Sequence, residues 1–118
     1  MPSLIYFTFY IHIMIATTPP PPYYAVIFTS LETTNTVAYL ETAKQMEELA
    51  KLQSGYLGLE TAREELGITV SYWKDLESIR NWKMNSEHSL AQKMGKEKWY
   101  AKYKTRICKV ERDYKFGF

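Results

Sequence analysis

The chain has 118 residues, of which 46% are hydrophobic and 24% are charged. This length fits a single domain, and the composition predicts a folded core and excludes a disordered chain. Its one cysteine excludes an intrachain disulfide and fits the reducing cytoplasm, where we expect the protein to be located. We expect this residue, Cys108, to pack in the core.

The formal net charge is only +2, but the basic residues gather near the C-terminus. Nine of the fifteen Lys and Arg residues lie from Lys93 onward, together with three of the thirteen acidic residues. Such a block is typical of an anion or nucleic-acid site, or of a solvated helix followed by the outer face of a strand. We favour the solvated surface and expect no nucleic-acid partner, because the chain has no recognised nucleic-acid motif.

Residues 1–22 differ from the rest of the chain. The apolar stretch 4–16 carries no charged side chain, but it is shorter than a membrane helix of about 20 residues. It also lacks the basic start and the small-residue cleavage site of a secretory signal. A stiff proline run follows. We therefore expect an N-terminal appendage and linker before a domain at 23–118, with Met14 as an alternative start. The alternative role for residues 1–13 is a weak membrane or partner anchor; we expect no membrane partner.

The domain is predicted to begin with a strand over residues 23–31, which are rich in aromatic and β-branched side chains. An amphipathic helix follows over 39–53, where apolar side chains recur at helical spacing. Its charged residues, Glu47 among them, are expected to lie largely off the apolar face. A Ser-Gly pair ends this helix, and residues 56–63 are predicted to form a second strand.

Residues 64–67 are predicted to form a hairpin loop, in which Gly67 supplies a permissive backbone. The third strand covers residues 68–73, where apolar and polar side chains alternate. Asp75 can cap the helix that follows. We expect a break in this helix near residues 85–86.

A last strand is expected within residues 100–114, which gives the order β-α-β-β-α-β. This order predicts an α+β ferredoxin-like fold: an antiparallel sheet with both helices on one face. The other face of the sheet would be bare, and a second copy of the chain is its usual cover. The sequence therefore predicts a homodimer.

Seven segments of the chain match, in order and spacing, a known family: YYAVIFTS (23–30), ETAKQMEELA (41–50), GYLGLE (55–60), GITVSYW (67–73), LESIRNWK (76–83), EHSLAQKMGKEKWY (87–100) and RICKVERDY (106–114). Over about residues 14–118 the chain resembles the antibiotic biosynthesis monooxygenase (ABM) domain family. This resemblance implies a homodimer of the dimeric α/β-barrel type, with a pocket between sheet and helices in each subunit.

The resemblance implies several activities. Some relatives oxidise polycyclic aromatic phenols to quinones with O₂ and no metal, flavin or nicotinamide; others bind haem and degrade it. We expect a cofactor-independent monooxygenase that acts on a small phenolic or polyketide-like aromatic compound. The alternatives are a haem-binding or haem-degrading monooxygenase and a dimer that binds a small ligand without catalysis, so whether the chain is an enzyme stays open.

Trp82 stands where haem-degrading relatives place a ring-distorting tryptophan, within a motif like Asn-Trp-x-x-Ser. Those relatives also have an iron-ligating histidine ten residues later, where this chain has Gln92. The only histidine of the predicted domain is His88, which is either a proton shuttle or ligand or an ordinary residue of the helix surface. Trp82 is likewise either catalytic or part of the core.

The phenol-oxidising reaction needs aromatic walls and a group that stabilises negative charge. Trp73, Tyr72, Trp99 and Tyr100 could supply walls and Arg106 a cation, although ordinary core packing of the aromatic side chains is the alternative. The candidate catalytic residues are therefore Trp82, His88, Trp73 and Arg106. The chain contains no nucleotide-binding or metal-ligand motif, so we expect no cofactor-binding or metal-ligating residues.

Overall fold

The structure is a computed structural model that describes residues 14–32, 36–94 and 100–118. Its elements are β1 (Tyr23–Glu32), α2 (Thr36–Lys51), β2 (Tyr56–Arg63), β3 (Leu66–Trp73), α3 (Leu76–Met94) and β4 (Tyr100–Val110). The β-α-β-β-α-β order confirms the ferredoxin-like α+β prediction. Residues 1–13 of the predicted appendage lie outside the described residues.

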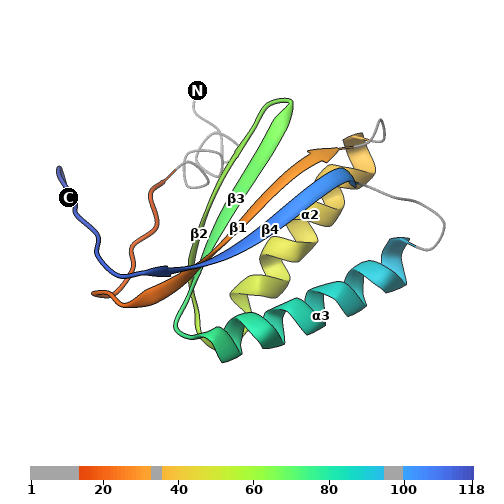
Figure 1. Ribbon diagram of the computed structural model, residues 1–118. Coiled ribbons are helices and arrows are strands. Elements are labelled where there is room, and N and C mark those ends of the chain that lie inside the picture. Colours follow the sequence, from red (N-terminus) through yellow and green to blue (C-terminus); the bar gives the residue numbers. More distant parts are fainter. Residues whose placement is uncertain (1–13, 33–35, 95–99) are drawn as a thin grey trace, which may run out of the picture.

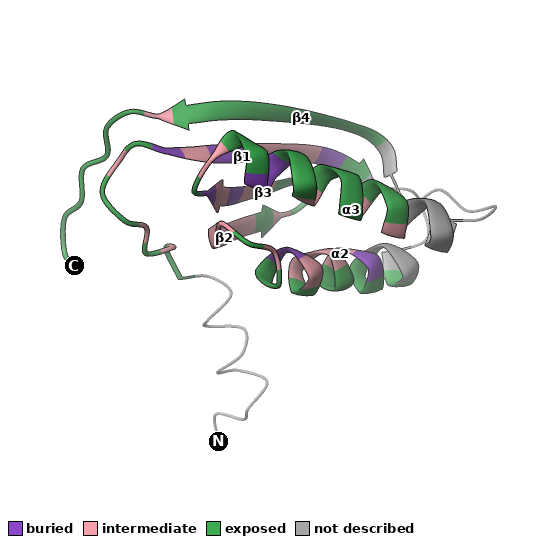
Figure 2. Ribbon diagram, turned by 90° about the horizontal axis from the view of Figure 1, so that it is seen from below, coloured by how far each residue is buried: buried purple, intermediate pink, exposed green. Residues whose placement is uncertain are grey.

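The four strands form one antiparallel sheet in the order β2-β3-β1-β4. Figure 1 shows α2 and α3 on the same side of this sheet, as the sequence predicts. Side chains alternate between the two faces of a strand, so every second residue points toward the helices. The sheet therefore has a helix-covered face and an open face, and β4 is the edge strand whose side chains from Lys102 to Lys109 are exposed (Figure 2).

The core lies at one end of the helix-covered face. Its buried cluster joins Val26 of β1, Ala50 of α2, Trp73 of β3 and Ile79 of α3. Trp73 has no exposed surface and is the one fully buried large side chain among the described residues. Both helices and the two central strands thus meet around a single indole ring.

Helix α3 begins where the sequence predicts. The Ser78 hydroxyl and the Ser78 backbone N–H donate to Asp75 Oδ1 over 2.7 and 2.8 Å, and these hydrogen bonds hold the pKa of Asp75 below its ordinary value. The predicted break near residues 85–86 was wrong. Asn85 donates to the Gln53 side chain and the Ser86 hydroxyl donates to the Lys83 carbonyl, so both polar side chains find partners while the helix continues.

The hairpin between β2 and β3 is shorter than predicted, because Gly67 lies within β3 and not in the turn. Gly67 pairs with Ser30 and with Arg63 on the two neighbouring strands. A Cβ atom at this position would collide with the Arg63 guanidinium. Glycine here leaves room for the guanidinium to approach the strand closely, and a larger residue would push the flexible end of Arg63 aside.

The open face carries apolar and half-buried side chains, including Ile27, Ile68 and Val70. Cys108 also lies on this face, opposite Ala25, and it is exposed. The expectation of a core cysteine was wrong because the edge position of β4 leaves Cys108 without a covering layer in the single chain. In the part of the chain that the structure describes, no helix is long and apolar enough to cross a membrane.

Residues just before β1 cover one end of the open face. The Ala16 backbone N–H donates to Glu60 over 2.9 Å, and the Tyr72 hydroxyl donates to the same carboxylate over 2.6 Å. The Ala16 side chain sits where a Cβ on Gly58 would be. The remaining open face is bordered by this segment on the β2 side and by basic side chains of β4 on the other.

We expect Trp73→Ala to lower the free energy of unfolding by about 3–5 kcal/mol, because it empties the centre of the buried cluster. Urea denaturation followed by circular dichroism measures this loss. Tyr114→Ala is the control: Tyr114 is 87% exposed, so its removal should change stability by less than about 0.5 kcal/mol. Equal losses in the two variants would show that Trp73 does not hold the core.

Candidate functional site

A cavity of about 650 Å³ lies between the helix-covered face of the sheet and the two helices. All four strands contribute to its floor, and α2 and α3 form its walls. This is the place where the family resemblance predicts a pocket, and its volume is within the usual range of small-molecule sites.

The strand register arranges the floor in rows that run across the sheet. From the core outward, the rows are Tyr24, Trp73, Tyr56 and Lys109; Val26, Ser71, Leu59 and Ile107; Phe28, Thr69, Thr61 and Thr105; and Ser30, Gly67, Arg63 and Tyr103. The first row carries three aromatic rings and, on β4, Lys109, and it lies outside the cavity lining. The lining passes from the largely apolar second row through the threonines of the third row to Arg63 in the fourth.

Two stacked tryptophans close the aromatic end of the pocket. The Trp82 ring of α3 stacks on Trp73 with a centroid distance of 6.0 Å and an interplanar angle of 21°. The Trp73 indole N–H donates to the Ser71 hydroxyl over 2.8 Å, and Tyr56 packs edge-on against Trp73. Trp82 lines the cavity. Its orientation is thus set by a buried ring that is itself held by a hydrogen bond.

The other end of the floor carries Arg63, which lines the cavity from the last residue of β2. Its Nη2 donates to the Ser30 hydroxyl over 3.1 Å, and Ser30 is buried. Nearby, Phe28 and Tyr103 pack edge-on at 5.4 Å between ring centroids. This end therefore combines a positioned guanidinium with an aromatic pair.

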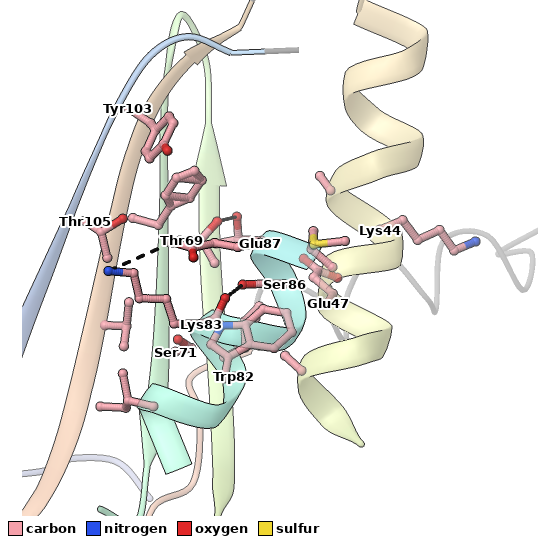
Figure 3. Close-up of a pocket in the computed structure, with 18 of the residues that line it drawn as sticks. Lys44, Glu47, Thr69, Ser71, Trp82, Lys83, Ser86, Glu87, Tyr103 and Thr105 are labelled. Carbon is pink, nitrogen blue, oxygen red and sulfur yellow. Dashed lines mark hydrogen bonds and ion pairs between the residues drawn. The ribbon is translucent and has the colours of Figure 1, made fainter. Parts of the chain in front are cut away.

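One acidic side chain of α2, Glu47, also lines the cavity and is half-buried. The expectation that Glu47 lies off the apolar face was wrong. It stands one helical turn from Ala43 and from Ala50, both of which line the same cavity. Burial and, to a smaller extent, the Glu47 carboxylate raise the pKa of the Tyr56 phenol. In Figure 3 the Glu47 side chain is directed toward Trp82 and Ser86 and not outward like that of Lys44.

An ion pair on α3 lies beside the cavity. Lys83 Nζ and Glu87 Oε1 are 4.0 Å apart, and both side chains are 65% exposed (Figure 3). Both residues line the cavity. Their exposure places this pair at the mouth of the pocket, where solvent weakens its contribution to stability.

Of the four candidate catalytic residues, the structure brings together Trp82 and Trp73, and it leaves His88 and Arg106 apart from them. Trp82 lines the cavity, and Trp73 lies directly behind it without being a lining residue. His88 is exposed and does not belong to the lining. Arg106 pairs with Ile27 in β4 and alternates with the pocket-facing Thr105 and Ile107, so it lies on the open face.

The remaining aromatic candidates are also separated. Tyr72 lies on the open face, where it contacts Glu60. The side chains of Trp99, Tyr100 and Gln92 lie outside the part that the structure describes. Among the described residues, no group of three or more His, Cys, Asp or Glu side chains is placed to hold a metal ion.

Sequence reasoning missed Arg63 and Glu47. The signal for Glu47 was present, because a charged residue at helical spacing between Ala43 and Ala50 falls on the apolar stripe. Arg63 continues the alternation by which Leu59 and Thr61 point toward the helices. The sequence does not show which of the two faces this set occupies, and the pairing of Arg63 with Gly67 in the structure does.

The chain is similar to YqjZ, an uncharacterised protein of Bacillus subtilis (strain 168), with 45% identity over 97 residues that cover 80% of this chain and 85% of YqjZ. No family model matches the chain. This degree of identity over most of both chains establishes common family membership.

Solved structures with the same fold include two with known ligands or reactions. SnoaB, a cofactor-independent oxygenase from Streptomyces nogalater, has a TM-score of 0.62 at 8% identity, covering 79% of this chain and 97% of SnoaB. A variant of MhuD with two manganese protoporphyrin IX molecules bound per active site has a TM-score of 0.61 at 16% identity, covering 79% of this chain and 99% of MhuD. At these identities the likeness concerns the fold. The chain therefore belongs to the family of Bacillus subtilis YqjZ, and it shares its fold with SnoaB, MhuD and a putative antibiotic biosynthesis monooxygenase from Nitrosomonas europaea (TM-score 0.57, 14% identity, covering 80% of this chain and 94% of that protein).

Proposed function

We propose that this protein is a cofactor-independent monooxygenase that oxidises a small aromatic phenol to a quinone. The observation that supports this proposal is the cavity of about 650 Å³, in which the fixed Trp82 ring and the Glu47 carboxylate share one end. A flat aromatic substrate can pack against the indole while its hydroxyl faces the carboxylate. The fold shared with SnoaB, a cofactor-independent oxygenase, is consistent with this chemistry.

The reaction requires a substrate that can itself reduce O₂. Glu47 accepts the phenolic proton, and the resulting phenolate donates an electron to O₂ more readily than the phenol does. A carbon–oxygen bond then forms at the activated ring carbon and gives a hydroperoxide. Loss of water leaves a carbonyl at that carbon, so one oxygen atom enters the quinone and the other leaves as water. The substrate supplies all the electrons that reduce O₂, so no external reductant is consumed.

We expect wild-type protein to accelerate oxygen uptake with 1,8-dihydroxyanthrone above its spontaneous oxidation. Glu47→Gln should lower kcat by about 10²–10⁴-fold, the usual contribution of a positioned base. Glu48→Gln is the matched control, because Glu48 is exposed on the same helix and does not line the cavity. An oxygen electrode measures the rates. No acceleration by the wild type, or equal losses in both variants, would contradict the assignment.

A haem-dependent reaction is the second candidate, and one observation favours it: Trp82 lines the cavity at the motif position of the haem-degrading relatives. However, the only histidine of the described residues, His88, is exposed and is not a lining residue. Imidazole is a common axial ligand of haem iron. Without an inward histidine in the described part, the cavity offers haem a tryptophan wall and no such ligand.

We therefore expect weak hemin binding by the wild type and by His88→Ala alike, measured as the Soret shift during a titration. Tight binding that is lost in His88→Ala would favour haem degradation over phenol oxidation as the function of the protein. Tight binding that survives the substitution would identify another ligand and equally contradict the expectation.

We further propose that two copies associate through the open faces of their sheets. The centre of the open face is apolar, with Ile68 39% exposed. Basic side chains of β4, including Lys104 and Arg106, border one side, and the exposed Glu64 and Glu65 of the β2–β3 hairpin lie on the opposite side, at the end of β2 away from Ala16. A two-fold arrangement can bring each basic edge to the acidic edge of the second copy, because a two-fold interface is complementary to itself.

Sedimentation at micromolar concentration should show a dimer for the wild type and a monomer for Ile68→Glu, since the substitution places a charge in the apolar centre. Glu77→Lys, at an exposed position of α3 away from the open face, should remain dimeric. A monomeric wild type, or a dimeric Ile68→Glu, would contradict association through this face.

A further inference from the structure

Charge and polarity are unevenly distributed along the pocket floor. Trp82 and Trp73 occupy one end, and Arg63 with Ser30 occupies the other. We propose that the ligand of this pocket is an aromatic carboxylate, held with its ring system at Trp82 and its carboxylate at Arg63. This inference deepens the proposed function, since it takes the same cavity as the substrate site and adds the class of substrate.

The Arg63 guanidinium is held by a hydrogen bond and lies close against a glycine. Its Nη2 donates to the buried Ser30 hydroxyl over 3.1 Å. Its plane lies against Gly67 of the neighbouring strand, where a side chain of any size would collide with it. A guanidinium whose orientation is set in advance loses little conformational freedom when it binds a ligand, and its planar N–H groups match the two oxygens of a carboxylate.

A permanent cation in a partly enclosed pocket favours a ligand group that is itself charged at neutral pH. Arginine stays protonated, a carboxylic acid is ionised above a pKa of about 4, and a phenol stays neutral up to about 10. An attraction between two full charges is also stronger where the protein replaces water. Arg63 is half-buried, so a carboxylate is the better partner than a phenol.

The acidic side chains that line the cavity do not make the Arg63 end negative. Glu87 pairs with Lys83 at the exposed mouth. Glu47 is directed toward Trp82 and Ser86 (Figure 3). The charges of the cavity are thus arranged with the proposed base at one end and the guanidinium at the other.

The register fixes how far apart the two ends are. Ser71, beside the tryptophans, and Gly67, under the guanidinium, are four residues apart on β3, which corresponds to about 13 Å. Between them lies the threonine row, where the hydroxyls of Thr61 and Thr69 are 3.0 Å apart. This length and this sequence of surfaces fit a fused-ring aromatic acid whose carboxylate lies at Arg63 and whose phenolic hydroxyl lies at the Glu47 end.

The test compares two probes that differ only in charge, anthracene-2-carboxylate and anthracene-2-carboxamide. Binding is measured by isothermal titration calorimetry at pH 7. Wild-type protein should prefer the carboxylate by about tenfold or more, and Arg63→Gln should bind the two probes equally. Circular dichroism verifies that each variant is folded.

A second variant keeps the charge but moves it. Gly67→Ala retains Arg63 and displaces its guanidinium, so it should lose most of the preference for the carboxylate. Arg80→Gln removes an exposed arginine of α3 that does not line the cavity, and it should keep the wild-type preference. If Arg80→Gln abolishes the preference as Arg63→Gln does, a general effect of net charge replaces the proposed contact.

Binding and oxygen uptake separate this inference from the proposed function. If the wild type binds both probes equally, or if Arg63→Gln keeps the preference, the carboxylate site is wrong whether or not the protein consumes oxygen. If the preference depends on Arg63 while no phenol is oxidised, the carboxylate site stands and the oxygenase assignment fails.

Discussion

The stacking of Trp82 on Trp73 is the contact on which the rest of the site depends. Trp73 is completely buried where β1, α2 and α3 meet, and its indole N–H is bound by Ser71. Because this ring cannot move without disrupting the core, the ring stacked on it becomes a rigid wall of the pocket. The centre of the core therefore also positions a side chain that lines the cavity.

The second constraint is the register of the sheet. Antiparallel pairing places residues that are far apart in sequence in the same row, and alternation decides which face each side chain occupies. A slip of one residue in β2 against β3 would turn Arg63 to the open face and bring Ala62 into the pocket. The passage of the cavity lining from apolar side chains to the Arg63 guanidinium is thus a consequence of strand pairing.

Much of the fold could be predicted from local patterns. The strand at residues 56–63, the cap at Asp75 and the order of elements follow from alternation, side-chain chemistry and helical spacing, which act over a few residues. The site was harder to predict. In β4 the apolar residues Ile107 and Cys108 are adjacent, so they point to opposite faces of the sheet. The sequence pattern alone therefore does not show which face Arg106 occupies, and the register with β1 decides it. Trp82 was found by its motif, whereas Arg63 depends on a long-range neighbour, Gly67, whose role is invisible in sequence.

The central claim is that the pocket orients an aromatic ligand between a fixed indole and a fixed guanidinium. A crystal structure of the protein with anthracene-2-carboxylate tests it most directly. The claim predicts the ring system packed against Trp82 and both carboxylate oxygens within hydrogen-bond distance of the Arg63 guanidinium. A ligand bound in the reverse direction, or bound only on the open face of the sheet, would contradict it.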